Sequence, residues 1–98
     1  MYYTYILKSL INNKYYIGYT ADLAKRLVEH NSGRVNFTRR YKPWELYYFE
    51  EYDDAKHANR RERQIKSWKS RAMIEKLKFN IEDPRNFINN FNKISGRQ

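Results

Sequence analysis

The sequence of 98 residues predicts one α+β domain, in which a small three-stranded antiparallel sheet is flanked by helices. Two stretches near the N-terminus and one in the middle of the chain are rich in tyrosine, isoleucine and other strand-forming residues. Between and after them, apolar residues recur at helical spacing behind residues that cap helices. The chain has no cysteine, so packing alone must hold its core.

The first two strands form a β-hairpin over residues 2–8 and 14–19. The stretch INNK between them predicts a turn, because Asn12 and Asn13 both tolerate left-handed backbone angles. We expect these two asparagines to form a two-residue turn.

In that register residue 5 lies opposite residue 20, so Tyr3, Tyr5 and Tyr16 share one face of the hairpin. Their hydroxyls either converge on one surface or belong to tyrosines that simply pack across strands. Gly18 lies on the same face. Since glycine is unfavourable inside a strand, it indicates a bulge, a close backbone approach or a kink that ends the strand.

The first helix follows the hairpin, with Thr20 as its expected cap and the stretch NSG at 31–33 as its end. Its apolar residues at helical spacing are Leu23, Leu27 and Val28. Residues 34–43 are predicted to form a basic loop. Residues 44–52, which are rich in aromatic side chains, predict the third strand.

Two helices are expected after the third strand. Asp53 or Asp54 caps a helix over about residues 55–68, and Ser70 caps a helix that runs to about Phe79.

A short last helix is predicted to start at Asp83, because Pro84 follows it, and the tail at 93–98 is expected to fray. We therefore expect a main domain over residues 1–82 and a short helix with a tail over residues 83–98.

The formal charge of +9 and the 10 tyrosines favour a polyanionic partner, nucleic acid first. The basic residues are scattered over several elements and no long apolar run accompanies them, which argues against a membrane partner. The N-terminus lacks the pattern of a secretory signal, so we expect a cytoplasmic protein.

Three residues on the predicted helices are candidates for chemistry. Arg26 and His30 are four residues apart and share a helix face, which is either functional or simply a solvated charged face. Glu62 falls inside the buried stripe between Ala58 and Ile65, where a carboxylate is costly unless it is paired or bound to a cation. It is therefore either an internal salt-bridge partner of an arginine or a ligand of a divalent ion.

The basic run over residues 56–71 surrounds Glu62 and is either a solvated surface or a track for a phosphate backbone. Lys66 lies one helical turn after Glu62, near any metal bound there.

The sequence resembles the GIY-YIG nuclease superfamily, most closely its small single-domain UPF0213 members. The stretch Tyr16-Ile17-Gly18 matches the second half of the motif, and Tyr3-Thr4-Tyr5 lies where the first half belongs, with Tyr3 in place of the glycine. Arg26 matches the helix arginine of the family, His30 falls where several members carry histidine, and the segment 60–68 places the metal-binding glutamate at Glu62. The likeness covers about residues 2–79, so the 1–82 unit is expected to be a GIY-YIG-like nuclease domain.

The resemblance implies a metal-dependent endonuclease that hydrolyses DNA phosphodiester bonds by water attack. Tyr5 or Tyr16 would orient or deprotonate the water, and Arg26 would grip the phosphate oxygens. Glu62 would hold one Mg²⁺ or Mn²⁺ ion, and His30 would hydrogen-bond a tyrosine or assist proton transfer. The expected substrate contacts are Gly18, Arg39, Arg40 and Lys66.

The expected partner is DNA before RNA, selected by its structure in repair or recombination or with the help of a protein partner. The alternative is a binding module that keeps the fold and the basic surface but does not turn over.

Overall fold

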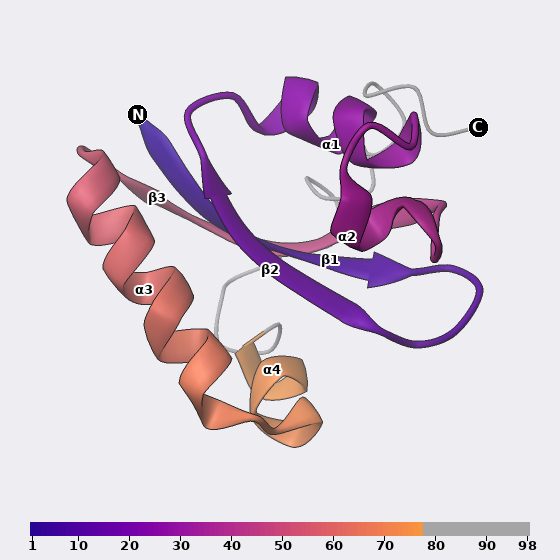
Figure 1. The fold of residues 1–98 in the computed structure, drawn as a ribbon. Helices are drawn as coiled ribbons and strands as arrows, with labels where there is room; N and C mark the ends of the chain where they lie inside the picture. Colours follow the sequence, from indigo (N-terminus) through magenta and orange to yellow (C-terminus); the bar gives the residue numbers. More distant parts are fainter. Residues whose placement is uncertain (78–98) are drawn as a thin grey trace.

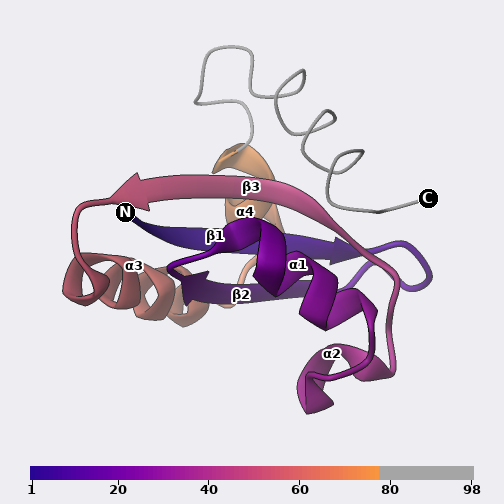
Figure 2. The same cartoon turned by 90° about the horizontal axis from the view of Figure 1, so that it is seen from above.

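A computed structural model describes residues 1–77, which fold around a three-stranded antiparallel sheet with the strand order β2-β1-β3. The strands are β1 (Tyr2–Ser9), β2 (Tyr15–Thr20) and β3 (Trp44–Tyr52). Figure 2 shows β1 between the other two strands. The predicted α+β class with a small antiparallel sheet is therefore confirmed.

Helices cover both faces of this sheet (Figure 1). The helices α1 (Leu23–Asn31) and α2 (Asn36–Arg39) lie on one side. The helices α3 (Ala55–Trp68) and α4 (Arg71–Leu77) lie on the other. None of the helices within residues 1–77 is long and apolar enough to cross a membrane.

The central strand β1 contributes to two cores because its side chains alternate between the two covered faces. One core lies under α1 and is built from Tyr5, Leu7, Leu23, Leu27, Trp44 and Leu46. The other lies under α3 and α4 and is built from Ile6, Tyr47, Tyr48, Ile65, Ile74 and Leu77. On this second face Thr4 donates a hydrogen bond from its hydroxyl to the carbonyl of Ala58, at 2.7 Å, and so ties β1 to α3.

The hairpin turn differs from the prediction. Tyr5 pairs with Gly18 rather than with residue 20, and the Ser9 amide donates to the Lys14 carbonyl at 2.9 Å. The connection therefore spans residues 10–13, and the expected two-residue turn was wrong. The register moves by two residues, so the expected tyrosines still share one face with Gly18, because the side-chain period of a strand is two.

The start of α1 also differs. Asp22, and not Thr20, is the N-cap, because its carboxylate accepts the Lys25 amide at 3.0 Å. Thr20 instead accepts the Asp22 amide at 3.2 Å and shapes the turn before the cap. The helix ends at 31 as expected, followed by Gly33 with φ +84°.

The predicted basic loop at 34–43 contains the short helix α2, which the sequence pattern did not indicate. The third strand and α3 have the predicted bounds, and Asp54 caps α3 by accepting the His57 amide at 2.9 Å. Ser70 caps α4 through the Met73 amide, as predicted.

Several predictions lie outside the described residues. They are the extension of the last described helix to about Phe79, the helix at Asp83 and Pro84, the fraying of the tail, and the domain boundary after residue 82.

Candidate active site

The candidate site lies around the Tyr5 hydroxyl, where three elements meet. Tyr5 comes from β1, Tyr16 from β2, and both Arg26 and His30 from α1. The Tyr16 ring packs 4.8 Å from the His30 ring and 6.3 Å from the Tyr5 ring, measured between centroids. The structure thus brings together four of the five residues expected to be catalytic, and Glu62 approaches from α3 as described below.

A buried chain of hydrogen bonds starts at this hydroxyl. The Tyr5 hydroxyl lies 2.9 Å from Nε2 of His30, and Nδ1 of His30 lies 2.7 Å from the Thr38 hydroxyl. Tyr5 is 1% exposed, and His30 and Thr38 are fully buried. Both ring nitrogens of His30 therefore have protein partners.

The protonation of His30 follows from its surroundings. Burial, and next the nearby charge of Arg26, lower its pKa to about 4. The imidazole is thus neutral at pH 7 and carries one proton. The Thr38 hydroxyl donates to the Val35 carbonyl at 3.4 Å, so it accepts from Nδ1. Nε2 is then the acceptor, and the Tyr5 hydroxyl donates to it.

Thr38 is a site residue that sequence reasoning missed. It lies on α2, whose four residues are too few to show helical periodicity. Its carbonyl also accepts the indole N–H of Trp44 at 2.8 Å, which fixes α2 against the start of β3. The sequence holds no local signal for this role, because the contact to His30 depends on tertiary packing.

Gly18 makes room for the Tyr5 side chain. A Cβ atom added at Gly18 would lie 2.6 Å from the Tyr5 hydroxyl oxygen and 3.1 Å from a Tyr16 ring carbon. The pairing of β1 with β2 is regular through this position and β2 continues to Thr20, so neither a bulge nor a strand end explains the glycine. The glycine is explained instead by the Tyr5 side chain of the neighbouring strand, which closely approaches the Gly18 backbone.

Burial keeps Tyr5 in its neutral phenol form, while the groups around it act in both directions. Burial raises its pKa most, hydrogen bonding from Arg26 lowers it, and the charge of Glu62 raises it again. The net effect is a pKa well above the ordinary value for tyrosine.

Arg26 keeps its charge beside this phenol. Burial works against the charged form, but hydrogen bonds to Tyr5 and Glu29 outweigh it and raise the pKa of Arg26. The guanidinium lies 3.1 Å from the Glu29 carboxylate, and its side chain remains 35% exposed. A fixed cation therefore borders the hydroxyl and still reaches solvent.

Glu62 lies on α3 between the buried Ala58 and Ile65, as predicted, and its side chain is 13% exposed. Its ion-pair partner is Lys66, one helical turn later, rather than an arginine. It is close enough to Tyr5 to affect the pKa of that hydroxyl, although α3 covers the opposite face of the sheet.

A divalent ion at this site would depend on Glu62. Residues 1–77 contain no group of three or more histidine, cysteine, aspartate or glutamate side chains that could hold a metal. A single carboxylate that is 13% exposed fits Mg²⁺, which keeps several waters and takes substrate phosphate oxygens as ligands.

The predicted contacts Arg39 and Arg40 lie apart from this cluster. Both are exposed at the end of α2, where they line a hollow together with Phe37 and Tyr41. No hydrogen bond or ion pair joins them to Tyr5 or His30 within residues 1–77, so their contact with substrate stays a prediction.

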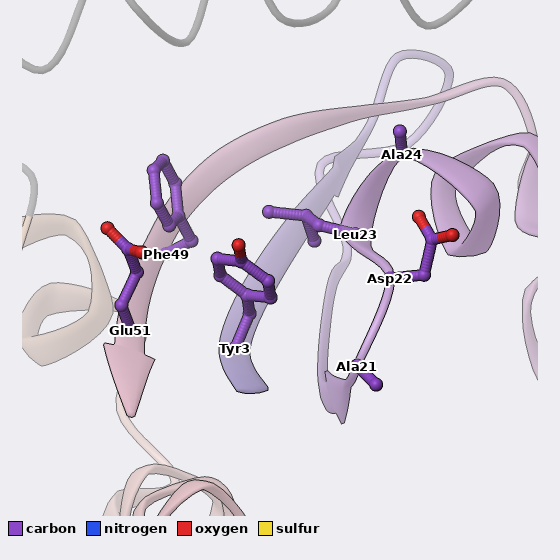
Figure 3. A pocket seen from close by; sticks show the side chains of 7 residues that line it. All are labelled: Tyr3, Ala21, Asp22, Leu23, Ala24, Phe49 and Glu51. Carbon is purple, nitrogen blue, oxygen red and sulfur yellow. The ribbon is translucent and has the colours of Figure 1, made fainter. Parts of the chain in front are cut away.

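A second hollow adjoins the site at Tyr3, the residue that replaces the first-motif glycine. Figure 3 shows Tyr3 between Phe49 and Leu23. The Tyr3 and Phe49 rings meet edge to face with their centroids 6.1 Å apart. The carboxylates of Asp22 and Glu51 also line the hollow, which makes it unsuited to phosphate.

This sheet, with a tyrosine on each hairpin strand and an arginine on the following helix, is the architecture of a GIY-YIG catalytic domain. A family model with that description matches residues 1–78. The chain therefore belongs to the GIY-YIG family, and its relatives place it among the small UPF0213 proteins. The family indicates nuclease activity, nucleic-acid binding and the use of divalent metal ions in general terms.

The relatives match most of the chain. A UPF0213 protein of Bacillus pumilus is 39% identical over 84 residues, which are 82% of this chain and 85% of that protein. A UPF0213 protein of Halobacterium salinarum is 38% identical over 79% of this chain and 99% of its own. The solution NMR structure of a UPF0213 protein from Bacillus halodurans has a TM-score of 0.53 at 31% identity, covering 86% of this chain and 89% of its own.

The Gly18→Ala variant tests the contact between strands. We expect a loss of about 1–3 kcal/mol in the free energy of unfolding, because the added methyl group overlaps the Tyr5 phenol. Urea denaturation measures it. In a Tyr5→Leu background the same substitution should cost much less, and an equal cost in both backgrounds would contradict the contact.

The buried His30 predicts a pH dependence of stability. Its lowered pKa means that the unfolded chain takes up a proton at higher pH than the folded chain does. The stabilisation from neutral His30 is therefore complete above pH of about 6.5 and is lost as the pH falls toward about 4.

Between about pH 7 and pH 4.5, the native protein should lose about 2 kcal/mol more unfolding free energy than a His30→Gln variant. Denaturation at both pH values measures the difference, and NMR titration of the imidazole gives the pKa directly. Parallel losses in the two proteins would contradict a buried neutral histidine.

Proposed function

We propose that this protein is an endonuclease that hydrolyses DNA phosphodiester bonds with the help of Mg²⁺ or Mn²⁺. The observation that carries the proposal is the hydrogen bond between the Tyr5 hydroxyl and a neutral imidazole beside a fixed guanidinium, with the Glu62 carboxylate near enough to affect the pKa of Tyr5. The family model supports the reaction class.

The Tyr5 hydroxyl is the proposed contact of the attacking water, which would reach it beside the partly exposed Arg26, because Tyr5 itself is 1% exposed. A free phenolate is disfavoured there, because burial raises the pKa of Tyr5. Tyr5 instead passes a proton along the chain: water gives its proton to the phenol oxygen while the phenol proton moves to Nε2 of His30. The water oxygen bonds to phosphorus, the bond to the leaving oxygen breaks, and that oxygen takes a proton from solvent.

His30 is a weak base in the free protein, because burial and Arg26 disfavour its charge. The negative charge of a bound phosphate beside Arg26 offsets that effect and makes the imidazolium easier to form. Thr38 keeps the acceptor nitrogen turned toward Tyr5, since it holds the opposite ring nitrogen.

Arg26 is the proposed clamp for the non-bridging phosphate oxygens. The Glu29 carboxylate holds one of its nitrogens, and the side chain remains 35% exposed, so a substrate can reach it from solvent. A guanidinium fixed in this way stabilises the charge that builds on the phosphate oxygens as water attacks.

Glu62 is the proposed ligand of the divalent ion, which when bound neutralises charge on the phosphate. Lys66 holds this carboxylate in the structure, so the ion competes with an ammonium group for it. The selection of DNA by its structure, a role in repair or recombination, and a protein partner that adds specificity are further parts of the proposal, and they rest on the family resemblance.

Cleavage of labelled DNA tests the activity. The native protein should cut at least one of the branched, flapped, duplex or single-stranded substrates when Mg²⁺ or Mn²⁺ is added. A Glu62→Gln variant should cut at least about 100-fold more slowly. Asp53→Asn, which neutralises an exposed carboxylate just before α3, is the matched control.

Absence of metal-dependent cutting, or equal cutting by the Glu62 variant, would overturn the proposal. Salt-sensitive binding without any cutting would favour the alternative of a nucleic-acid-binding module.

The two tyrosines are predicted to differ in their effects. Tyr5→Phe removes the hydroxyl that joins water to His30, so kcat should fall by about 100-fold or more. Tyr16→Phe keeps the ring that packs on His30 and should lower kcat less. Single-turnover cleavage of the best substrate compares the two, and the reverse order would assign the water to Tyr16.

A further inference from the structure

A hollow lies between the edge strand β2 and the turn that joins α3 to α4. None of its lining residues is acidic within the part of the chain that the structure describes. Ile17, Ile65 and Ile74 supply much of its apolar lining. Its cationic lining residues are Lys14, Lys66, Lys69 and Arg71.

Two of these cations are paired and another is placed over a ring. Lys66 pairs with Glu62, and Arg71 lies 3.5 Å from the Glu75 carboxylate. The Lys14 ammonium lies 5.1 Å from the centre of the Tyr41 ring.

Lys69 forms no ion pair within residues 1–77 and is exposed. Of the four cations, Lys69 alone has neither an ion pair nor a place over a ring within residues 1–77, so its charge is the one most open to a ligand.

The backbone of Lys69 is unusual for a lysine. It ends α3 in the left-handed conformation, with φ 49° and ψ 39°. Glycine or asparagine is the ordinary residue at this position of a helix end, because a side chain with a Cβ is strained there. The strained lysine indicates a use for its side chain, since a glycine would end the helix more favourably.

The hollow adjoins the proposed catalytic site. Lys66 lies four residues after Glu62 on α3, a rise of about 6 Å, and the two side chains are paired. On β2, Ile17 lines the hollow, while its neighbour Gly18 lies under the Tyr5 hydroxyl. These two positions face opposite sides of the sheet, so a nucleic-acid strand that meets both must cross the free edge of β2.

We propose that this hollow binds the phosphate backbone of the DNA strand next to the scissile bond, with Lys69 as its main contact. The proposal rests on the proposed function. Ammonium groups bind phosphates as point charges without reading the bases, so the hollow supplies affinity and position but no sequence preference.

The test is the Lys69→Gly variant, which removes the charge and relieves the backbone at the same time. Binding to a fluorescent flapped DNA is measured at several salt concentrations in EDTA, which removes divalent ions, so that cleavage plays no part. The slope of log K against log salt should fall by about 0.7 to 0.9, the value for one lost phosphate contact. The affinity at low salt should drop by about three- to tenfold.

Three comparisons complete the experiment. Lys69→Arg should restore binding, and Lys25→Ala, which removes an exposed charge on α1, should change the affinity less than about twofold. The urea midpoint of Lys69→Gly should equal or exceed that of the parent protein, because a glycine relieves the left-handed position.

Unchanged binding by Lys69→Gly would overturn the proposal, and so would a lower urea midpoint, which would assign Lys69 to stabilising the end of α3. Because the binding measurement requires no hydrolysis, its result can be interpreted even if the nuclease proposal fails.

Discussion

The contact on which the site depends is the passage of the Tyr5 phenol across Gly18. Tyr5 lies on the central strand, so its hydroxyl reaches the neighbouring strand only if that strand carries no side chain opposite. From there it meets His30, and through His30 the Thr38 hydroxyl. A methyl group at position 18 would displace the phenol, and His30 would then lack its partner inside a dry interior. The absence of a Cβ atom at Gly18 thus permits the buried chain of hydrogen bonds from Tyr5 through His30 to Thr38.

Burial around this chain has opposite effects on its members. It lowers the pKa of His30 and raises that of Tyr5, so both groups are neutral and can share a hydrogen bond without a net charge. Arg26 keeps its charge because it is partly exposed and paired with Glu29. The interior therefore holds the groups that move a proton, while the charged groups that would meet a phosphate lie at the rim. This separation suits chemistry on an anionic substrate, since buried charges would have to be desolvated.

Patterns local to the sequence were predictable, and contacts between distant segments were not. The third strand is rich in aromatic residues, α3 has helical periodicity and an aspartate cap, and the bounds of both were predicted correctly. The length of the hairpin loop was wrong, but the shared face of the tyrosines survived because the error was an even number of residues. The helix α2 was missed because four residues carry no period, and with it the role of Thr38. Residue spacing alone did not decide which neighbouring cation pairs with Glu62, because the pairing with Lys66 depends on the side-chain rotamers available on α3.

The hydrogen bond from Thr4 to the Ala58 carbonyl fixes α3 against the central strand β1. Thr4 is the neighbour of Tyr5 on β1, and in an α-helix the carbonyl of residue 58 points toward the amide of Glu62. The dipeptide Thr4-Tyr5 therefore positions both groups. Tyr5 carries the phenol, and Thr4 binds α3 one helical turn before the carboxylate of Glu62. The hairpin loop can accordingly vary in length during evolution without changing the spacing between these two groups. Sequence changes should therefore accumulate in that loop, while Thr4 and Tyr5 keep the phenol and the carboxylate in place.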